Sequence, residues 1–95
     1  MKSAQLTSGF TRADFVLTFA IADADRRARL AALCESEWGG TRITETTWEL
    51  ATRLSPGELE IALASHLAAG DSAAYYYLAD APAQTKRLFR IVIEG

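Results

Sequence analysis

Two carboxylates that directly follow an apolar run are the side chains best placed for chemistry. Asp23 and Asp25 come after a run that ends at Ile21, where a predicted strand passes into a predicted helix. Side chains at such a junction are exposed and commonly functional. Two acids there can hold Mg²⁺ or Mn²⁺ together with water and phosphate oxygens. Asp23 is therefore a candidate metal ligand, and Asp23 and Asp25 are candidate catalytic residues of a metal-dependent phosphodiesterase.

The same two acids also have a structural interpretation. Carboxylates near a helix N-terminus are stabilised by the helix dipole. Each acid precedes an arginine by four residues, Arg27 for Asp23 and Arg29 for Asp25, which is the favoured orientation for an ion pair on a helix. Capping and pairing explain both residues without a metal. The sequence thus leaves two alternatives open, no cofactor or a bound Mg²⁺ or Mn²⁺.

Three arginines, Arg26, Arg27 and Arg29, occupy the first turns of this predicted helix. Cations at that end oppose the helix dipole, so a nearby anion would offset them. The phosphate backbone of a nucleic acid could supply it, joined by Arg42, Arg53 or Lys86-Arg87 if they fold nearby. A solvated surface is the alternative. The sequence therefore predicts Arg26, Arg27, Arg29 and Arg42 as nucleic-acid contacts.

Other kinds of chemistry lack the residues that they need. The only histidine, His66, and the only cysteine, Cys34, fall on apolar stripes of predicted helices, where packing is the common outcome. No glycine-rich phosphate loop joins a predicted strand to a helix. Within one strand, Tyr75 and Tyr77 face opposite to Tyr76. We expect one of these sides in the core and the other at a partner interface.

Composition restricts the chain to one small domain. Its 95 residues are 49% hydrophobic and 23% charged, with a net charge of −2. This balance excludes a disordered chain and argues against broad electrostatic attraction to nucleic acid. Eighteen alanines bury little area each, so the domain is marginal alone and a homodimer is expected. The apolar runs are too short for a membrane span, no secretory signal is visible, and one cysteine closes no internal disulfide, so a cytoplasmic protein is expected.

Periodicity predicts six elements. They are a strand over 14–21, a helix over 22–40 that stops at Gly39-Gly40, strand residues over 41–52, a helix over 55–70, and strands over 72–79 and 86–94. The second helix has the clearest start, because Ser55, Pro56 and Glu58 form a capping box with proline at the first helical position. Residues 41–52 form either one bent strand or two short ones, and we favour a bend near Thr46–Trp48.

The resulting order is β-α-β-(β)-α-β-β, which predicts an α+β fold. We expect a single domain over residues 13–95: a ferredoxin-like two-layer sandwich of βαββαβ type, with an antiparallel sheet and both helices on one face. Residues 1–12 are predicted to be a flexible tail, and Pro82 is predicted to interrupt a loop before the last strand.

Two short segments resemble the second CRISPR-associated core protein family. Residues 19–27, FAIADADRR, with Leu30 beyond them, are similar to the end of that family's first strand and the start of its helix; the matching residues are Phe19, Ile21, Asp23, Arg26 and Arg27. Residues 42–49, RITETTWE, are similar to its second strand; the matching residues are Arg42, Thr46, Trp48 and Glu49.

The resemblance implies a ferredoxin-like symmetric dimer whose last strand packs across the partner's sheet. Members of the family are described as metal-dependent nucleases on RNA or DNA, or as adaptors in spacer acquisition that contact duplex DNA and bridge integrase subunits. The family's metal-binding aspartate corresponds here to Ala20, whose methyl group cannot coordinate Mg²⁺. We therefore expect a dimeric adaptor, structural or nucleic-acid-contacting, without nuclease activity. An integrase subunit is a candidate partner; a metal-dependent endonuclease and an interaction module unrelated to nucleic acid are the alternatives.

Overall fold

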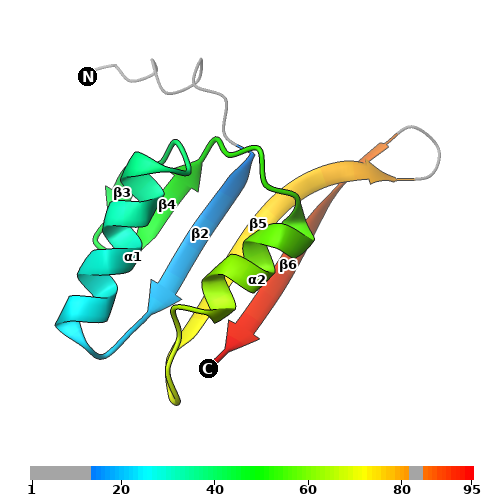
Figure 1. Ribbon diagram of the computed structural model, residues 1–95. Coiled ribbons are helices and arrows are strands. Elements are labelled where there is room, and N and C mark those ends of the chain that lie inside the picture. The colour runs from blue at the N-terminus through cyan, green and yellow to red at the C-terminus, as the bar shows by residue number, and fades with distance from the viewer. Residues whose placement is uncertain (1–13, 82–84) are drawn as a thin grey trace.

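The computed structural model describes residues 14–81 and 85–95, which form one sheet and two helices (Figure 1). In chain order the elements are β2 (Phe15–Ala20), α1 (Ala24–Ser36), β3 (Thr41–Thr44), β4 (Thr47–Leu50), α2 (Pro56–Ala64), β5 (Ser72–Ala81) and β6 (Thr85–Glu94). The predicted α+β class is confirmed. The predicted tail over 1–12 and Pro82 lie outside the described residues.

The five strands follow the order β3-β4-β2-β5-β6, and each neighbouring pair is antiparallel. The first described strand, β2, lies in the centre, where Leu17 stands opposite Trp48 of β4 and Tyr75 of β5. Strands β5 and β6 pair along their whole lengths. The last strand thus pairs within its own chain, whereas the family resemblance places it on the partner's sheet.

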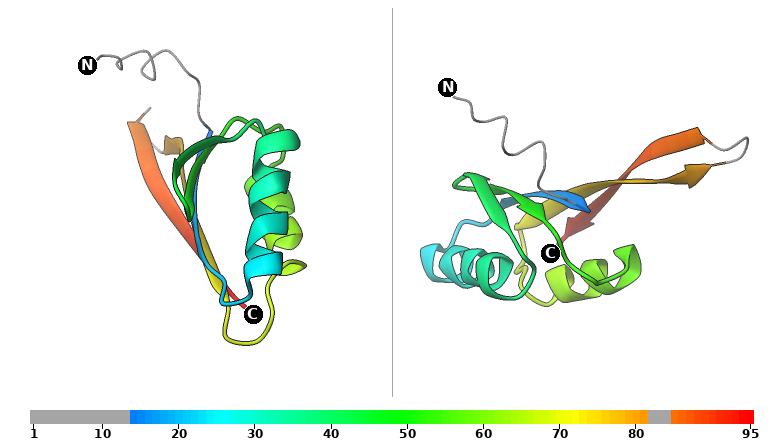
Figure 2. Two further views of the ribbon diagram at one scale, coloured as in Figure 1. Left: turned by 90° about the vertical axis from the view of Figure 1, so that its left-hand side faces the viewer. Right: turned by 90° about the horizontal axis from the view of Figure 1, so that it is seen from above.

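Both helices lie on the same side of the sheet, so the molecule has two layers (Figure 2). Helix α1 lies toward β3 and β4, and α2 toward β5 and β6 (Figure 1). We call the side of the sheet under the helices the covered face and the opposite side the open face. No helix in the part of the chain described here has both the length and the apolar character to cross a membrane.

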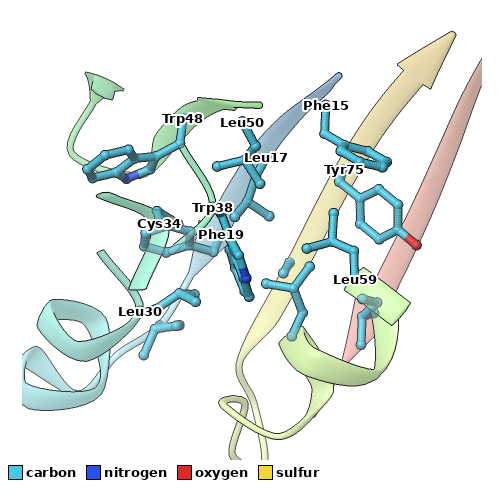
Figure 3. Close-up of a cluster of buried hydrophobic side chains, with 14 residues drawn as sticks. Phe15, Leu17, Phe19, Leu30, Cys34, Trp38, Trp48, Leu50, Leu59 and Tyr75 are labelled. Atoms are coloured by element: carbon cyan, nitrogen blue, oxygen red, sulfur yellow. The ribbon is translucent and has the colours of Figure 1, made fainter. Parts of the chain in front are cut away.

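Strand alternation sends the large apolar side chains of β2 to the covered face. Phe15, Leu17 and Phe19 are buried, whereas the alternate residues Val16, Thr18 and Ala20 are exposed or half-buried. Side chains from the sheet and both helices complete the core (Figure 3): Ile21, Leu30, Cys34, Trp38, Trp48, Leu50, Leu59, Leu63, Ala73, Tyr75 and Ile93. These residues hold the two layers together.

The start of α2 is confirmed as predicted. The Ser55 hydroxyl accepts a hydrogen bond from the backbone N–H of Glu58 at 3.2 Å, and the Glu58 carboxylate accepts one from the backbone N–H of Ser55 at 2.8 Å. These bonds, chiefly the one from the Ser55 backbone, hold the pKa of Glu58 below its usual value. The helix ends earlier than predicted, at Ala64, and Gly70 adopts a φ of +89° in the turn before β5.

The favoured interpretation of residues 41–52 is wrong. They form two short strands, β3 and β4, and not one bent strand. Between them the backbone N–H of Thr46 donates to the Thr44 hydroxyl at 3.3 Å. A threonine hydroxyl can hold a turn in this way without an Asn-Gly or Asp-Gly pair, so the usual sequence signal of a hairpin is missing.

Candidate functional site

The junction between β2 and α1 positions the two candidate acids. Asp23 is the N-cap of α1, and its carboxylate accepts a hydrogen bond from the backbone N–H of Arg26 at 2.8 Å. Asp25 is exposed in the first turn. The predicted cap at Asp23 is therefore confirmed, and one of its carboxylate oxygens is engaged by it. The expected ion pairs of Asp23 with Arg27 and of Asp25 with Arg29 are not among those that form within the described residues.

The arginines that follow have different partners from those that the spacing suggests. Arg26 binds Asp71, the residue before β5, with 2.8 Å between its Nη2 and Oδ2 of the carboxylate. The guanidinium of Arg27 donates to the backbone carbonyl of Ile21 at 2.7 Å. Both side chains therefore reach across the junction and help to fix the start of α1 against the end of β2.

Asp71 is the buried charge on which this junction depends. It is 3% exposed, and its carboxylate accepts hydrogen bonds from the backbone N–H groups of Ala68 at 2.9 Å and Ala22 at 3.3 Å, besides the guanidinium of Arg26. The bond from Ala68 is the largest cause that lowers the pKa of Asp71, with the bond from Arg26 adding to it and burial opposing it. No local sequence pattern indicates this role, because the partners of Asp71 lie up to 49 positions away.

Arg27 and Arg42 are brought together in one groove at the end of β2, between α1 and the β3–β4 turn. The groove, of about 790 Å³, is lined by both arginines, Glu45, five alanines and Gly70 among others. We call it the arginine groove. Arg42 stands opposite Trp48 in the β3–β4 ladder and is exposed, and it makes no ion pair within residues 14–81 and 85–95. Its charge is therefore available to a ligand.

The remaining predicted cations lie elsewhere. Arg26 and Arg29 line a smaller hollow of about 160 Å³ with His66, on the side of α1 that faces α2. The four predicted arginines are therefore split between two sides of α1. Of these four, Arg27 and Arg42 line the same groove.

The donors at this junction do not fit the metal site of the family that the sequence resembles. Ala20 lines the arginine groove with a methyl group, and the Asp23 carboxylate is engaged by the backbone. In the described ranges, no three side chains among His, Cys, Asp and Glu gather closely enough to hold a metal ion.

Cys34 and Tyr75 are core residues. Cys34 is fully buried in α1, and burial raises its pKa to about 12, so the thiol is a poor nucleophile at neutral pH. Tyr75 is also fully buried, and burial is the main cause that raises its pKa to about 12. Tyr75 packs with Tyr77 and Phe15 on the covered face. The predicted opposite orientation of the tyrosines and the core position of one side are confirmed, since Tyr76 lies on the opposite face.

The open face carries apolar side chains that nothing in the described chain covers. Leu78 is 64% exposed, Leu88 61%, Val92 56% and Val16 39%. They lie on three adjacent strands, β2, β5 and β6, because Leu78 pairs with Leu88 and Val92 pairs with Ala74. Several large apolar side chains exposed together on one face of a sheet are typical of a surface that binds a macromolecular partner. This set of exposed side chains could have been predicted from the sequence, because alternate residues of β5 and β6 point to opposite faces of the sheet.

Comparison with known proteins adds no relative. A scan against protein-family models finds no match for the chain, and searches of curated proteins and of solved structures return none. The candidate surfaces are therefore the arginine groove and the open face, each defined by its own side chains.

Proposed function

We propose that this protein is a dimeric adaptor of ferredoxin-like topology that contacts the phosphate backbone of a nucleic acid and performs no hydrolysis. The observation that carries the proposal is the arginine groove. Arg27 and Arg42 face a hollow whose wall includes five alanines, so a strand can approach closely and meet two guanidinium groups. Guanidinium groups bind phosphate oxygens through paired, charge-assisted hydrogen bonds.

The strand arrangement supports the ferredoxin-like part of the proposal. The order β2-α1-β3-β4-α2-β5 follows the βαββαβ pattern, and β2 lies between β4 and β5. Strand β6 extends that arrangement at one edge. Residues 19–27 and 42–49, which resemble the second CRISPR-associated core protein family, are consistent with such an adaptor. An integrase subunit of the kind that acts in spacer acquisition is then the expected protein partner.

Hydrolysis is left out of the proposal on chemical grounds. In the family that the sequence resembles, the metal-binding aspartate corresponds to Ala20, whose methyl group cannot orient a metal or a water. Asp23 lies three residues on, where its carboxylate caps α1. The residues that remain can bind and position a phosphate backbone, which is what an adaptor needs.

Arg42→Ala tests the proposal, with Arg53→Ala as the matched control. Arg53 is also exposed but lines a different hollow, beside Tyr77 and Leu78. Binding of a fluorescent duplex is measured by anisotropy between 50 and 300 mM salt. We expect Arg42→Ala to weaken binding about fivefold, roughly 1 kcal/mol for one hydrogen-bonded contact. The slope of log K against log salt should become shallower by about one for each phosphate interaction that the substitution removes.

Two results would overturn the proposal. One is a wild-type protein that binds neither duplex nor single strand at 50 mM salt, and the other is equal weakening of binding by Arg42→Ala and Arg53→Ala. The same samples incubated with Mn²⁺ separate the adaptor from the nuclease. Cleavage that Asp23→Ala abolishes would replace the adaptor with a metal-dependent nuclease.

A further inference from the structure

Four neighbouring side chains on the open face run from an acid on β4 to a base on β6, and Thr41 of β3 lies beyond the acid at the edge of the sheet. The pairing registers place Glu49 of β4 beside Val16 of β2, Val16 beside Tyr76 of β5, and Tyr76 beside Arg90 of β6. All four point away from the helices, because their neighbours along each strand belong to the covered face. The order across the row is therefore acid, apolar, aromatic, base.

The two charges of this row have no ion-pair partner within the described chain. In residues 14–81 and 85–95, the ion pairs that form are Arg26 with Asp23 and Asp71, and Lys86 with Asp80. Glu49 and Arg90 are in none of them. They are held three strands apart on one rigid sheet, so they cannot meet each other.

The neighbouring rows are either small or apolar. The row on one side runs Thr47, Thr18, Ala74 and Val92, whose short central side chains let another surface approach closely. On the other side of Tyr76 lies the exposed pair Leu78 and Leu88. Covering such a surface with another apolar surface is favourable, because apolar area on both sides is removed from water.

We infer that a second copy of this chain covers the open face, through a two-fold axis that runs along the strands between β2 and β5. Such a rotation keeps each row level and reverses the order of its members. Glu49 of each copy then lies opposite Arg90 of the other, and Val16 lies opposite Tyr76. One surface meets itself in an isologous contact, with two ion pairs flanking an apolar centre.

The charges on this face favour a copy of the chain over a nucleic acid. Glu49, Asp80 and Glu94 outnumber Lys86 and Arg90, and Asp80 already neutralises Lys86 at 2.8 Å. A phosphate backbone laid here would meet carboxylates, whereas a second copy offers Glu49 a cation. Two antiparallel sheets pack about 10 Å apart with strands nearly aligned, which suits an axis along the strands.

This inference rests on the dimer that the proposed function assumes, and it adds which surface forms that dimer. Because the arginine groove opens at the end of β2 beside α1, stacking through the open face leaves Arg42 free in both copies. Binding of nucleic acid and formation of the dimer can therefore be tested on separate residues.

A charge exchange between positions 49 and 90 is the decisive experiment. The dimer dissociation constant of the full chain is measured by sedimentation for Glu49→Arg, for Arg90→Glu and for the double variant, with circular dichroism to check folding. Each single variant replaces both ion pairs with repulsive contacts, so we expect dimerisation to weaken roughly tenfold or more. The double variant restores both ion pairs with the acid and the base exchanged, and its dissociation constant should return to within about threefold of the wild-type value. Glu35→Arg, the same charge change at an exposed site of α1, should leave dimerisation unaltered.

A crosslinking measurement covers the case in which a charge variant fails to fold. Glu49→Cys combined with Arg90→Cys should give covalent dimers with a bismaleimide too short to reach from β4 across β2 and β5 to β6 within one chain. Glu49→Cys alone should give none. The background from Cys34 is low because that thiol is buried and its pKa is raised to about 12.

The outcomes separate this inference from the proposed function. A dimer that resists both single charge variants and forms no crosslink has its interface elsewhere, which overturns the inference and leaves the adaptor standing. A chain that remains monomeric at all concentrations overturns both the inference and the dimer in the proposal. Absence of an Arg42 effect on nucleic-acid binding, with the charge exchange behaving as expected, overturns the proposed function alone.

Discussion

Leu17 and Val16 are neighbours in β2, yet they experience opposite environments. Leu17 is 0% exposed under the helices, in a core that includes Trp48 and Tyr75, whereas Val16 is 39% exposed on the open face. The same contrast runs along β5, where Tyr75 is buried and Leu78 is largely exposed. Two faces made by the same strands therefore differ mainly in whether helices cover them.

The difference indicates that side chains on one face stabilise the folded chain, whereas those on the other face are available to bind a partner. The covered face holds the bulky aromatic residues, and their burial supplies most of the stability of the single chain. The open face holds smaller or isolated apolar residues among charges, which is more typical of an interface than of a core. The contrast predicts that substitutions on the two faces affect different measurable quantities.

The largest effect should come from Leu17→Ala. Removing a fully buried leucine side chain should cost about 2–5 kcal/mol of the free energy of unfolding, because it leaves a cavity in the core. Val16→Ala, one residue away, should cost within about 0.5 kcal/mol in the monomer. Urea titrations followed by circular dichroism at two protein concentrations measure both. Equal destabilisation at low concentration would mean that the open face is packed as tightly as the covered face, which would refute the contrast.

The elements that could be predicted from the sequence are those set by local chemistry. The β2 alternation follows from Phe15, Leu17 and Phe19, and the start of α2 follows from the capping box of Ser55 and Glu58, because neighbouring residues fix both. The α+β class followed from the order of these elements. The opposite orientation of adjacent tyrosines in β5 could be predicted from the alternation of side chains along any strand.

The rest depended on contacts between distant residues. The split of residues 41–52 into β3 and β4 rests on a hydroxyl of Thr44 that bonds locally, a signal weaker than a glycine turn. The division of the arginines rests on Asp71, which draws Arg26 to one side across 45 positions of sequence. Arg42 meets Arg27 only because β3 folds back beside α1. Sequence spacing along one helix could not indicate any of these arrangements.

The second effect concerns two acids whose pKa values are both lowered, one buried and one exposed. Asp71 is held by backbone N–H groups and Arg26, whereas Asp80 is held by the exposed Lys86. At pH 7, Asp71→Asn should lower the unfolding temperature measurably, although by less than Leu17→Ala does. Asp80→Asn should leave the unfolding temperature nearly unchanged, because a surface ion pair contributes little to stability. Thermal unfolding of both variants measures the difference. A larger destabilisation by Asp80→Asn would contradict the assignment of Asp71 as the buried charge on which the junction depends.

The pH dependence of the Asp71 effect has a definite sign. Because the folded-state pKa lies below the ordinary value of 3.8, the stabilisation is present above that value and disappears as pH falls through the folded-state pKa. The gap in unfolding temperature between wild type and Asp71→Asn should therefore be constant from pH 5 to 7 and narrow below about pH 4. A gap that stays constant down to pH 2 would show that charge at Asp71 is not what stabilises the junction.

The smallest effect compares two adjacent tyrosines on opposite faces. The Tyr75 hydroxyl donates a hydrogen bond to the backbone carbonyl of Pro56 at the start of α2, so Tyr75→Phe should cost about 1 kcal/mol of the free energy of unfolding. Tyr76→Phe, on the open face, should change it by less than about 0.5 kcal/mol. Because burial raises the pKa of Tyr75 to about 12, the neutral phenol is the favoured folded form, and its contribution should fade as pH rises above the ordinary value of 10.0. Urea titrations at pH 7 and at pH 10.5 measure both expectations. If the two variants are equally destabilised at pH 7, the tyrosine hydroxyls do not distinguish the covered face from the open one, and the contrast rests on apolar packing alone.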